Sequence, residues 1–103
     1  MIARVWHGWT TRANGDTYAQ MLLDEILPGI KRRPIPGLRG VSLYRRNVGD
    51  ETEFVTTLLF ESLDDVSMFA GADYEVAVIH EAARPLLTRF DARSAHYDIL
   101  LSA

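Results

Sequence analysis

Residues 53–61 read EFVTTLLFE, and this stretch decides the fold because it predicts a β-strand that is apolar on both of its faces. Successive side chains of a strand point to opposite faces, so Phe54 and Phe60 share one face, whereas Val55 and Leu59 share the other. A sheet with one face in water alternates apolar with polar residues. This strand does not, and we therefore expect both faces of its sheet to be covered.

The flanking segments predict the element order β-α-β-β-α-β. Gly49–Asp50 is typical of a hairpin turn, and Gly71 of a helix end. The expected elements are, in chain order, a strand over 2–10, a helix from about residue 17, strands over 39–47 and 53–61, a short helix over 63–70 and a strand over 92–101. This order is the ferredoxin-like fold, an α+β arrangement with a four-stranded antiparallel sheet and both helices on one face.

Three stretches interrupt regular structure. Pro28–Gly29 is expected to kink or end the first helix. The prolines of RPIPG, residues 33–37, exclude regular helix and central strand. Residues 73–90 mix strand and helix signals, and we expect an irregular connection that ends in a short helix. The apolar stripe of the first helix consists of Tyr18, Met21, Leu22 and Ile26.

The first predicted strand is also apolar on both faces, because Trp6 lies on one face and His7 and Trp9 lie on the other. A chain of 103 residues has the size of one domain, which we expect over residues 1–103, and its two predicted helices cover only one side of the sheet. An exposed apolar face would invite aggregation. The simplest cover is a second copy packed face to face, so we expect a homodimer.

Composition argues against several classes of protein. The formal net charge is −3, and basic residues form only small clusters such as residues 31–33, so we expect no binding to nucleic acid. The chain has neither an apolar run of about 20 residues nor a signal peptide, and we expect a cytoplasmic protein that does not bind membranes. It has no cysteine, which excludes disulfides, thiolate nucleophiles and Cys-ligated metals.

The three histidines predict no metal site, since no two of them have metal-ligand spacing. His7 is either a base or hydrogen-bond donor, or a satisfied core histidine. We expect Tyr97 to pack under the helices and His96 to face the dimer side with Asp98, as an Asp–His pair that either raises the pKa of the imidazole or is a surface pair. His80 lies in a segment expected to arch over the mouth of a cavity.

Aromatic and basic residues supply further candidates. Tyr74 lies in a loop and either lines a pocket or covers a helix end. Arg45 and Arg46 alternate faces, so one of them can offer a guanidinium fork to a substrate oxygen. No nucleotide-binding, P-loop, GxSxG or paired-carboxylate motif occurs. Five aromatic side chains either bind a flat apolar ligand or form plain core: Trp6, Trp9, Phe54, Phe60 and Phe69.

The chain resembles the antibiotic biosynthesis monooxygenase-like proteins, which are small dimeric α/β barrels built from ferredoxin-like halves. The resemblance covers nearly the whole chain, but its segments are patterns of packing and turns, so it implies the fold more than an activity. The segments are MIARVWHGWT at 1–10, IPGLRGVSLYRR at 35–46, EFVTTLLFESLDDVSMFAGADYE at 53–75 and HYDIL at 96–100.

Members of this family oxygenate aromatic polyketide-like phenols without metal or flavin. The resemblance therefore implies a monooxygenase that needs no cofactor and acts on a small aromatic or phenolic molecule. Such a reaction needs a base and a group that stabilises the anion. We expect His7 or His96 as the base and Arg45 or Arg4 as the stabiliser. The residues expected to bind the substrate are Trp6, Trp9, Phe60, Phe69, Tyr74 and His80.

Two alternatives stay open. One is a non-catalytic dimeric protein that binds a small molecule, because one fold supports unrelated roles. The other is haem degradation, for which relatives use an asparagine on the first strand and a tryptophan and a histidine near the second helix. Here the first strand has no asparagine, Phe69 stands where the indole is expected, and His80 falls beyond that register. The sequence therefore argues against haem degradation.

Overall fold

The computed structural model describes all residues, 1–103. Its strands are β1 (Ile2–Thr11), β2 (Leu38–Val48), β3 (Glu51–Phe60), β4 (Leu87–Phe90) and β5 (Ala95–Asp98). Its helices are α1 (Arg12–Met21), the π-helical turn η1 (Leu22–Ile26), α2 (Leu27–Arg32), α3 (Leu63–Ala70) and the short 3₁₀ turn η2 (Arg84–Leu86). None of the helices is both long enough and apolar enough to cross a membrane.

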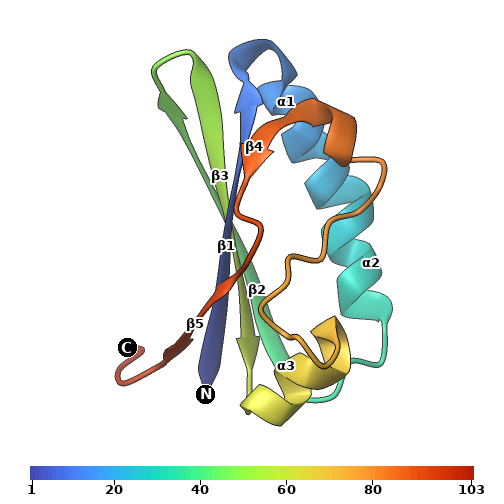
Figure 1. The fold of residues 1–103 in the computed structure, drawn as a ribbon, viewed down its shortest axis with the longest axis vertical. Coiled ribbons are helices and arrows are strands. Elements are labelled where there is room, and N and C mark those ends of the chain that lie inside the picture. The colour runs from blue at the N-terminus through green and yellow to red at the C-terminus, as the bar shows by residue number, and fades with distance from the viewer.

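The strands form one antiparallel sheet in the order β2-β3-β1-β4, and β5 pairs with the other half of β1. β4 and β5 together therefore fill the place of the fourth strand, and the predicted ferredoxin-like fold is confirmed (Figure 1). The β2–β3 hairpin turns at Gly49, which has the positive φ of 58° that this turn needs.

The prediction of one last strand over 92–101 was wrong, because this strand begins at Leu87 and is interrupted over residues 91–94. At the interruption the chain turns from β1 toward residues 75–77. The N–H of Ala77 donates to the carbonyl of Ala92 at 2.9 Å, and the N–H of Ser94 donates to that of Glu75 at 2.6 Å. The backbone groups thus keep partners, and this pairing ties the connection after α3 to the sheet.

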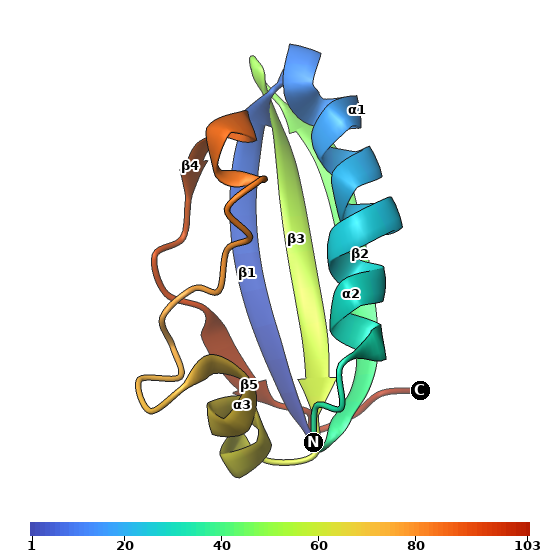
Figure 2. The ribbon, with the colours of Figure 1, turned by 90° about the vertical axis from the view of Figure 1, so that its right-hand side faces the viewer.

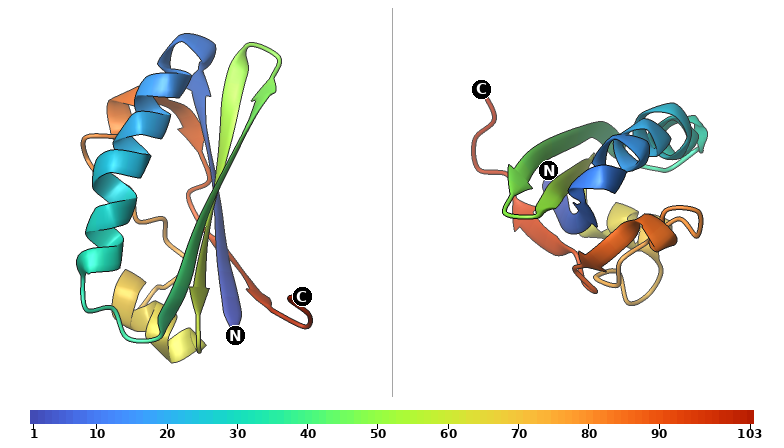
Figure 3. Two further views of the ribbon diagram at one scale, coloured as in Figure 1. Left: turned by 180° about the vertical axis from the view of Figure 1, so that it is seen from behind. Right: turned by 90° about the horizontal axis from the view of Figure 1, so that it is seen from above.

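α1, η1 and α2 run on as one long helix across a single face of the sheet (Figures 1 and 3). The helix begins five residues before the predicted start, since the side chain of Thr11 caps it by accepting from the N–H of Asn14 at 3.1 Å. Figure 2 shows this helix on the β2 side of that face and the connection that follows α3 on the β4 side.

Pro28–Gly29 was predicted to kink or end the helix. The helix does not end there, because it continues to Arg32. In η1 the N–H of Leu27 donates to the carbonyl of Leu22, five residues back, instead of four. This shift of the hydrogen-bond ladder occurs just before Pro28, which has no N–H to donate. The wider turn therefore accommodates the proline inside the helix.

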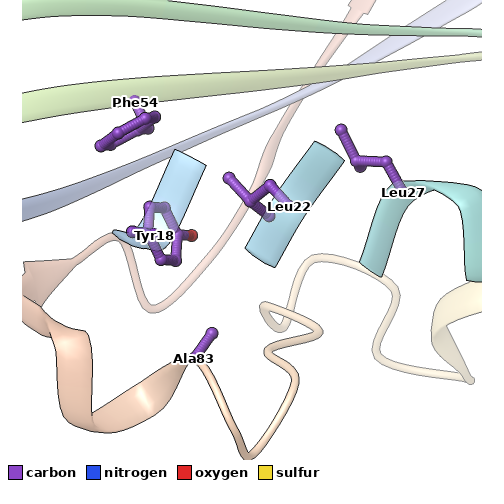
Figure 4. Close-up of a cluster of buried hydrophobic side chains, with 5 residues drawn as sticks. All are labelled: Tyr18, Leu22, Leu27, Phe54 and Ala83. Carbon is purple, nitrogen blue, oxygen red and sulfur yellow. The ribbon is translucent and has the colours of Figure 1, made fainter. Parts of the chain in front are cut away.

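The core lies between the sheet and the helices. Tyr18 contacts Phe54 edge to face, with ring centroids 4.8 Å apart, in the cluster of Figure 4. That cluster consists of Tyr18, Leu22, Leu27, Phe54 and Ala83. A second cluster near α3 consists of Ile2, Leu58, Phe60 and Val66.

The other face of the sheet carries no helix. Tyr44 and Tyr97 lie on it, and each is 59% exposed. The register of β1 against β5 pairs Ala3 with Tyr97 and Arg4 with His96. His96 therefore shares the helix side with the buried Arg4, and the prediction that Tyr97 packs under the helices while His96 faces away was wrong.

Candidate functional site

A cavity of about 70 Å³ lies between the sheet, the long helix and the connection after α3. The sheet contributes Arg4, Trp6, Thr56, Leu58 and, beyond β4, Ser94. The helices contribute Tyr18, Leu22, Ile26, Leu27, Ile30 and Phe69, and the connection contributes Val78, Ile79, His80 and Ala83. The π turn thus supplies part of the wall, and such turns are frequent at functional sites.

Trp6 forms the part of the wall that lies over β1. Its indole Nε1 donates to the carbonyl of Asp91 at 2.8 Å, within the interruption of the last strand. The six-membered ring of Trp6 lies over Gly8, where a Cβ atom would be only 2.6 Å from it. Glycine at that position and the carbonyl of Asp91 therefore fix the indole against the cavity.

Arg4 places a cation in this largely apolar wall. The residue is only 4% exposed. Its Nη2 donates to the carbonyl of Val76 at 3.0 Å, and its Nη1 donates to the carbonyl of Tyr74 and to His96 Nε2. No carboxylate pairs with it, and burial lowers the pKa of the guanidinium. The positive charge is therefore compensated only by neutral groups.

His96 adjoins this guanidinium as a neutral ring. Because arginine can only donate, the Nε2 of His96 accepts at 3.0 Å and its proton lies on Nδ1. Burial, and then the positive charge of Arg4, lower the pKa of His96. Its Nδ1 is buried and has no hydrogen-bond partner. The pair is thus a cation beside a neutral donor.

Tyr18 stands toward the other end of the cavity and is 2% exposed. Its hydroxyl makes no hydrogen bond with the protein, and Figure 4 shows it on the Leu22 side of the ring. Burial raises the pKa of Tyr18 to about 12. The hydroxyl therefore stays protonated at neutral pH and is a free donor. Sequence reasoning missed it, because Tyr18 belongs to an apolar helix stripe that reads as core.

His80 lines the cavity from the connection. Its Nδ1 accepts from the N–H of Ala82 at 3.1 Å, so the proton of the neutral ring lies on Nε2. Of the residues predicted to bind a substrate, Trp6, Phe69 and His80 line the cavity. Tyr74 packs its ring 5.0 Å from that of His96, next to Arg4.

Other predicted site residues lie away from the cavity. His7 and Trp9 stack on the helix-free face with ring centroids 5.9 Å apart. Arg45 pairs with Asp16 at 2.9 Å near the protein surface. Phe60 is fully buried in the core, with its ring centroid 5.8 Å from that of Phe69.

His7 belongs to a separate polar network. Its Nδ1 lies 2.9 Å from the buried carboxylate of Glu53, which also pairs with Arg46. Hydrogen bonds from Arg46 and then from His7 lower the pKa of Glu53. No group of three or more His, Asp or Glu side chains is arranged to hold a metal ion.

The fold is that of the antibiotic biosynthesis monooxygenase-like proteins, as the resemblance predicted. One similar structure is a Bacillus cereus protein described as a candidate antibiotic biosynthesis monooxygenase, with a TM-score of 0.65 and 12% identity over 99% of this chain and 93% of that one. Another is the haem degrader MhuD from Mycobacterium tuberculosis with two haems bound in its active site, with a TM-score of 0.64 and 17% identity over 100% of this chain and 99% of that one. No protein-family model matches the sequence, and no curated protein matches it. At these identities the likeness concerns the fold.

Proposed function

We propose that the chain is a cytoplasmic, homodimeric monooxygenase that needs no cofactor and acts on a small aromatic or phenolic molecule. The observation that carries the proposal is the buried Arg4 guanidinium, which lines an aromatic cavity without a carboxylate partner. Trp6 and Phe69 offer flat apolar surfaces to a ring, and Arg4 offers a positive charge to its oxygen. The fold of the Bacillus cereus protein supports the same reaction class.

The chemistry needs an electron-rich anion that reacts with O₂ directly. Arg4 stabilises the phenolate or enolate oxygen of the substrate. The substrate carbon that lies across the ring from this oxygen attacks O₂. A methylene carbon then becomes a carbonyl. One oxygen atom of O₂ enters the product, the other leaves as water, and the substrate supplies all four electrons. No redox group of the protein is required for this balance.

The substrate phenol loses its proton because the charge of Arg4 lowers the pKa of that phenol, and no histidine acts as the base. The Nε2 of His96 and the Nδ1 of His80 both accept hydrogen bonds already, so neither ring offers a free lone pair to the cavity. His7 lies on the other face of the sheet. A nearby cation lowers the pKa of a bound phenol, and the proton leaves to water.

Substrate size is limited by the cavity. Its volume of about 70 Å³ is below the roughly 300 Å³ at which pockets for drug-sized ligands begin. A substrate with several rings therefore requires movement of residues 78–83, which line the cavity from the connection. Haem does not fit the cavity, and we expect no shift of the Soret band when haem is titrated into the protein.

The homodimer is supported by the helix-free face. Tyr44 and Tyr97 are each 59% exposed on it, and the strand pairing places Val5, Val55 and Leu59 between them. A second copy packed on this face would bury these side chains. The cavity lies on the opposite side of the sheet, so a dimer on the helix-free face would not cover it.

Oxygen uptake with dithranol, a dihydroxyanthrone, tests the proposed function together with the movement of residues 78–83 that a three-ring substrate requires. The wild-type protein is expected to consume O₂ and form the anthraquinone faster than buffer, and Arg4→Gln is expected to lose most of this rate. Arg45→Gln is the matched control, because Arg45 pairs with Asp16 outside the cavity. A ligand-induced rise in melting temperature without O₂ uptake would instead support the non-catalytic binding protein.

A further inference from the structure

We propose that the ligand of this cavity is a planar aromatic anion with oxygen atoms at both ends, one ionised and bound by Arg4, the other hydrogen-bonded by the Tyr18 hydroxyl. This inference uses the cavity of the proposed function and names the class of molecule that fits it. It assigns Tyr18 as a binding residue, a role that the proposed reaction does not require.

The cationic end has donors left over. A guanidinium carries five N–H donors, and three contacts of Arg4 are to Tyr74, Val76 and His96. The Nε–H and one Nη2–H remain, which suits the two-pronged recognition of a carboxylate or the binding of a phenolate. The residue is 96% buried, as its 4% exposure shows, so these donors do not face bulk water.

A second cation, the exposed Arg33, lies near the same aromatic ring as Arg4. Arg33 lies 5.6 Å from the centroid of the Phe69 ring, and Arg4 lies 5.7 Å from it. Neither cation has a carboxylate partner, whereas the nearby Glu75 is already paired with Arg93 at 3.1 Å. An anionic ligand group would therefore be the first negative partner at this end of the cavity.

The opposite end offers a neutral donor. Tyr18 packs on Phe54, which is opposite Gly8 in the sheet, whereas Arg4 is opposite Leu58. The two groups are thus separated by four residues of β1, or about 13 Å along the strand before their side chains extend into the cavity. Tyr18 lines the cavity, and its hydroxyl makes no hydrogen bond with the protein. A ligand oxygen beside Tyr18 would accept a hydrogen bond from this hydroxyl.

Binding of three single-ring probes tests the inference by calorimetry at neutral pH. Para-hydroxybenzoate has an anion and a hydroxyl, benzoate has only the anion, and para-hydroxybenzamide has only the hydroxyl. We expect the benzamide to bind about tenfold more weakly than para-hydroxybenzoate, because it lacks the charge that Arg4 recognises.

Variants separate the two ends of the ligand. Tyr18→Phe is expected to weaken para-hydroxybenzoate about fivefold and to leave benzoate unchanged. Tyr97→Phe removes a hydroxyl from the helix-free face and should change neither affinity. Arg4→Lys keeps a charge and should retain a preference for anions, while Arg4→Gln should lose it, with circular dichroism checking that each variant folds.

Equal affinity for the acid and the amide would overturn the inference, as would an equal loss of benzoate and para-hydroxybenzoate binding in Tyr18→Phe. The outcome is distinct from that of the proposed function. Binding with the expected pattern but without O₂ uptake would leave the inference standing and remove the monooxygenase. Oxygen uptake with no preference for anions would do the reverse.

Discussion

Tyr18 links the stability of the protein to the chemistry of its cavity. Its ring packs on Phe54 in the core, while its hydroxyl remains without a protein partner. The packing is expected to persist when the oxygen is removed. Tyr18→Phe is therefore a variant in which the effect of the hydroxyl can be measured against an otherwise intact core.

The raised pKa of Tyr18 predicts a loss of stability at alkaline pH. The pKa is 10.0 in the unfolded chain and about 12 in the folded protein. The stabilisation that this difference represents is fully present below pH 10 and is lost as the pH rises toward 12, because only the unfolded chain then ionises. We expect the free energy of unfolding to fall by up to about 3 kcal/mol over this range through Tyr18.

Urea denaturation at a series of alkaline pH values measures this effect. The difference in unfolding free energy between wild type and Tyr18→Phe should shift in favour of the variant above pH 10. A Tyr97→Phe variant, which alters an exposed ring, should follow the wild type. Parallel curves for wild type and Tyr18→Phe would contradict the prediction.

His96 predicts the opposite dependence on the acid side. Burial and the charge of Arg4 depress its pKa below the usual 6.5. The associated stability is present above that pH and is lost as the pH falls through the lower folded value, since the unfolded chain binds the proton first. His96→Gln keeps an acceptor for Arg4 but does not titrate, so its unfolding free energy should decline less between pH 7 and pH 5. An equally steep decline in the variant would show that other groups cause the loss.

At the scale of elements, the turn before β2 depends on one glycine. Gly37 has a φ of 73°, and a Cβ atom there would lie 2.1 Å from Oδ2 of Asp65 and 2.9 Å from its Cβ. Asp65 belongs to the first turn of α3, where its N–H donates to the Ser62 hydroxyl at 3.2 Å. The turn and the start of α3 are therefore packed against each other.

Gly37→Ala is expected to destabilise the protein more than Gly49→Ala. Gly49 also has a positive φ, 58°, but nothing lies within 4 Å of a Cβ placed there. Gly49→Ala should cost about 1 kcal/mol from backbone strain alone, and Gly37→Ala should cost at least about 1 kcal/mol more. Thermal unfolding of both variants measures the difference, and equal melting temperatures would show that Asp65 moves aside freely.

The elements that the sequence predicted well are those with strong local signals. The strand predicted over 53–61 is observed as β3, Glu51–Phe60. Both of its faces carry apolar side chains, because Phe54 packs in the core under the helix and Val55 lies beside His7 on the helix-free face. The helix over 63–70 is observed with the same bounds. Serine at 62 and glycine at 71 define these ends by capping, which is a local effect.

The candidate site was harder to predict, because it depends on register and on long-range pairing. The face occupied by His96 follows from the break at residues 91–94, which arises from pairing with residues 75–77. A shift of one residue reverses the face of every side chain in a strand. For the group that stabilises the anion, the sequence predicted either Arg45 or Arg4. It could not choose between them, because strand alternation alone does not tell which face of the sheet meets the helices.

At the scale of the whole molecule, the helix-free face predicts an association that one substitution can break. Val55→Arg places a charge at the centre of this face, between β1 and β2. The wild type is expected to sediment as a dimer of 11.6 kDa subunits at micromolar concentration, and Val55→Arg as a monomer. Met68→Arg alters a side chain that is 73% exposed on α3 and should remain dimeric. A wild-type monomer would contradict the homodimer.

The π turn η1 has a consequence for how the length of this chain can vary. A π turn holds one residue more than an α-helical ladder needs, so removal of a single residue there would leave an uninterrupted α-helix. Each residue rotates a helix by about 100°. The π turn absorbs its extra residue, so deletion of the exposed Leu23 there would leave Leu27 and Ile30 facing the sheet. Deletion of a residue from the regular helix α1 has no such absorbing turn, and it would rotate Leu27 and Ile30 away from the cavity.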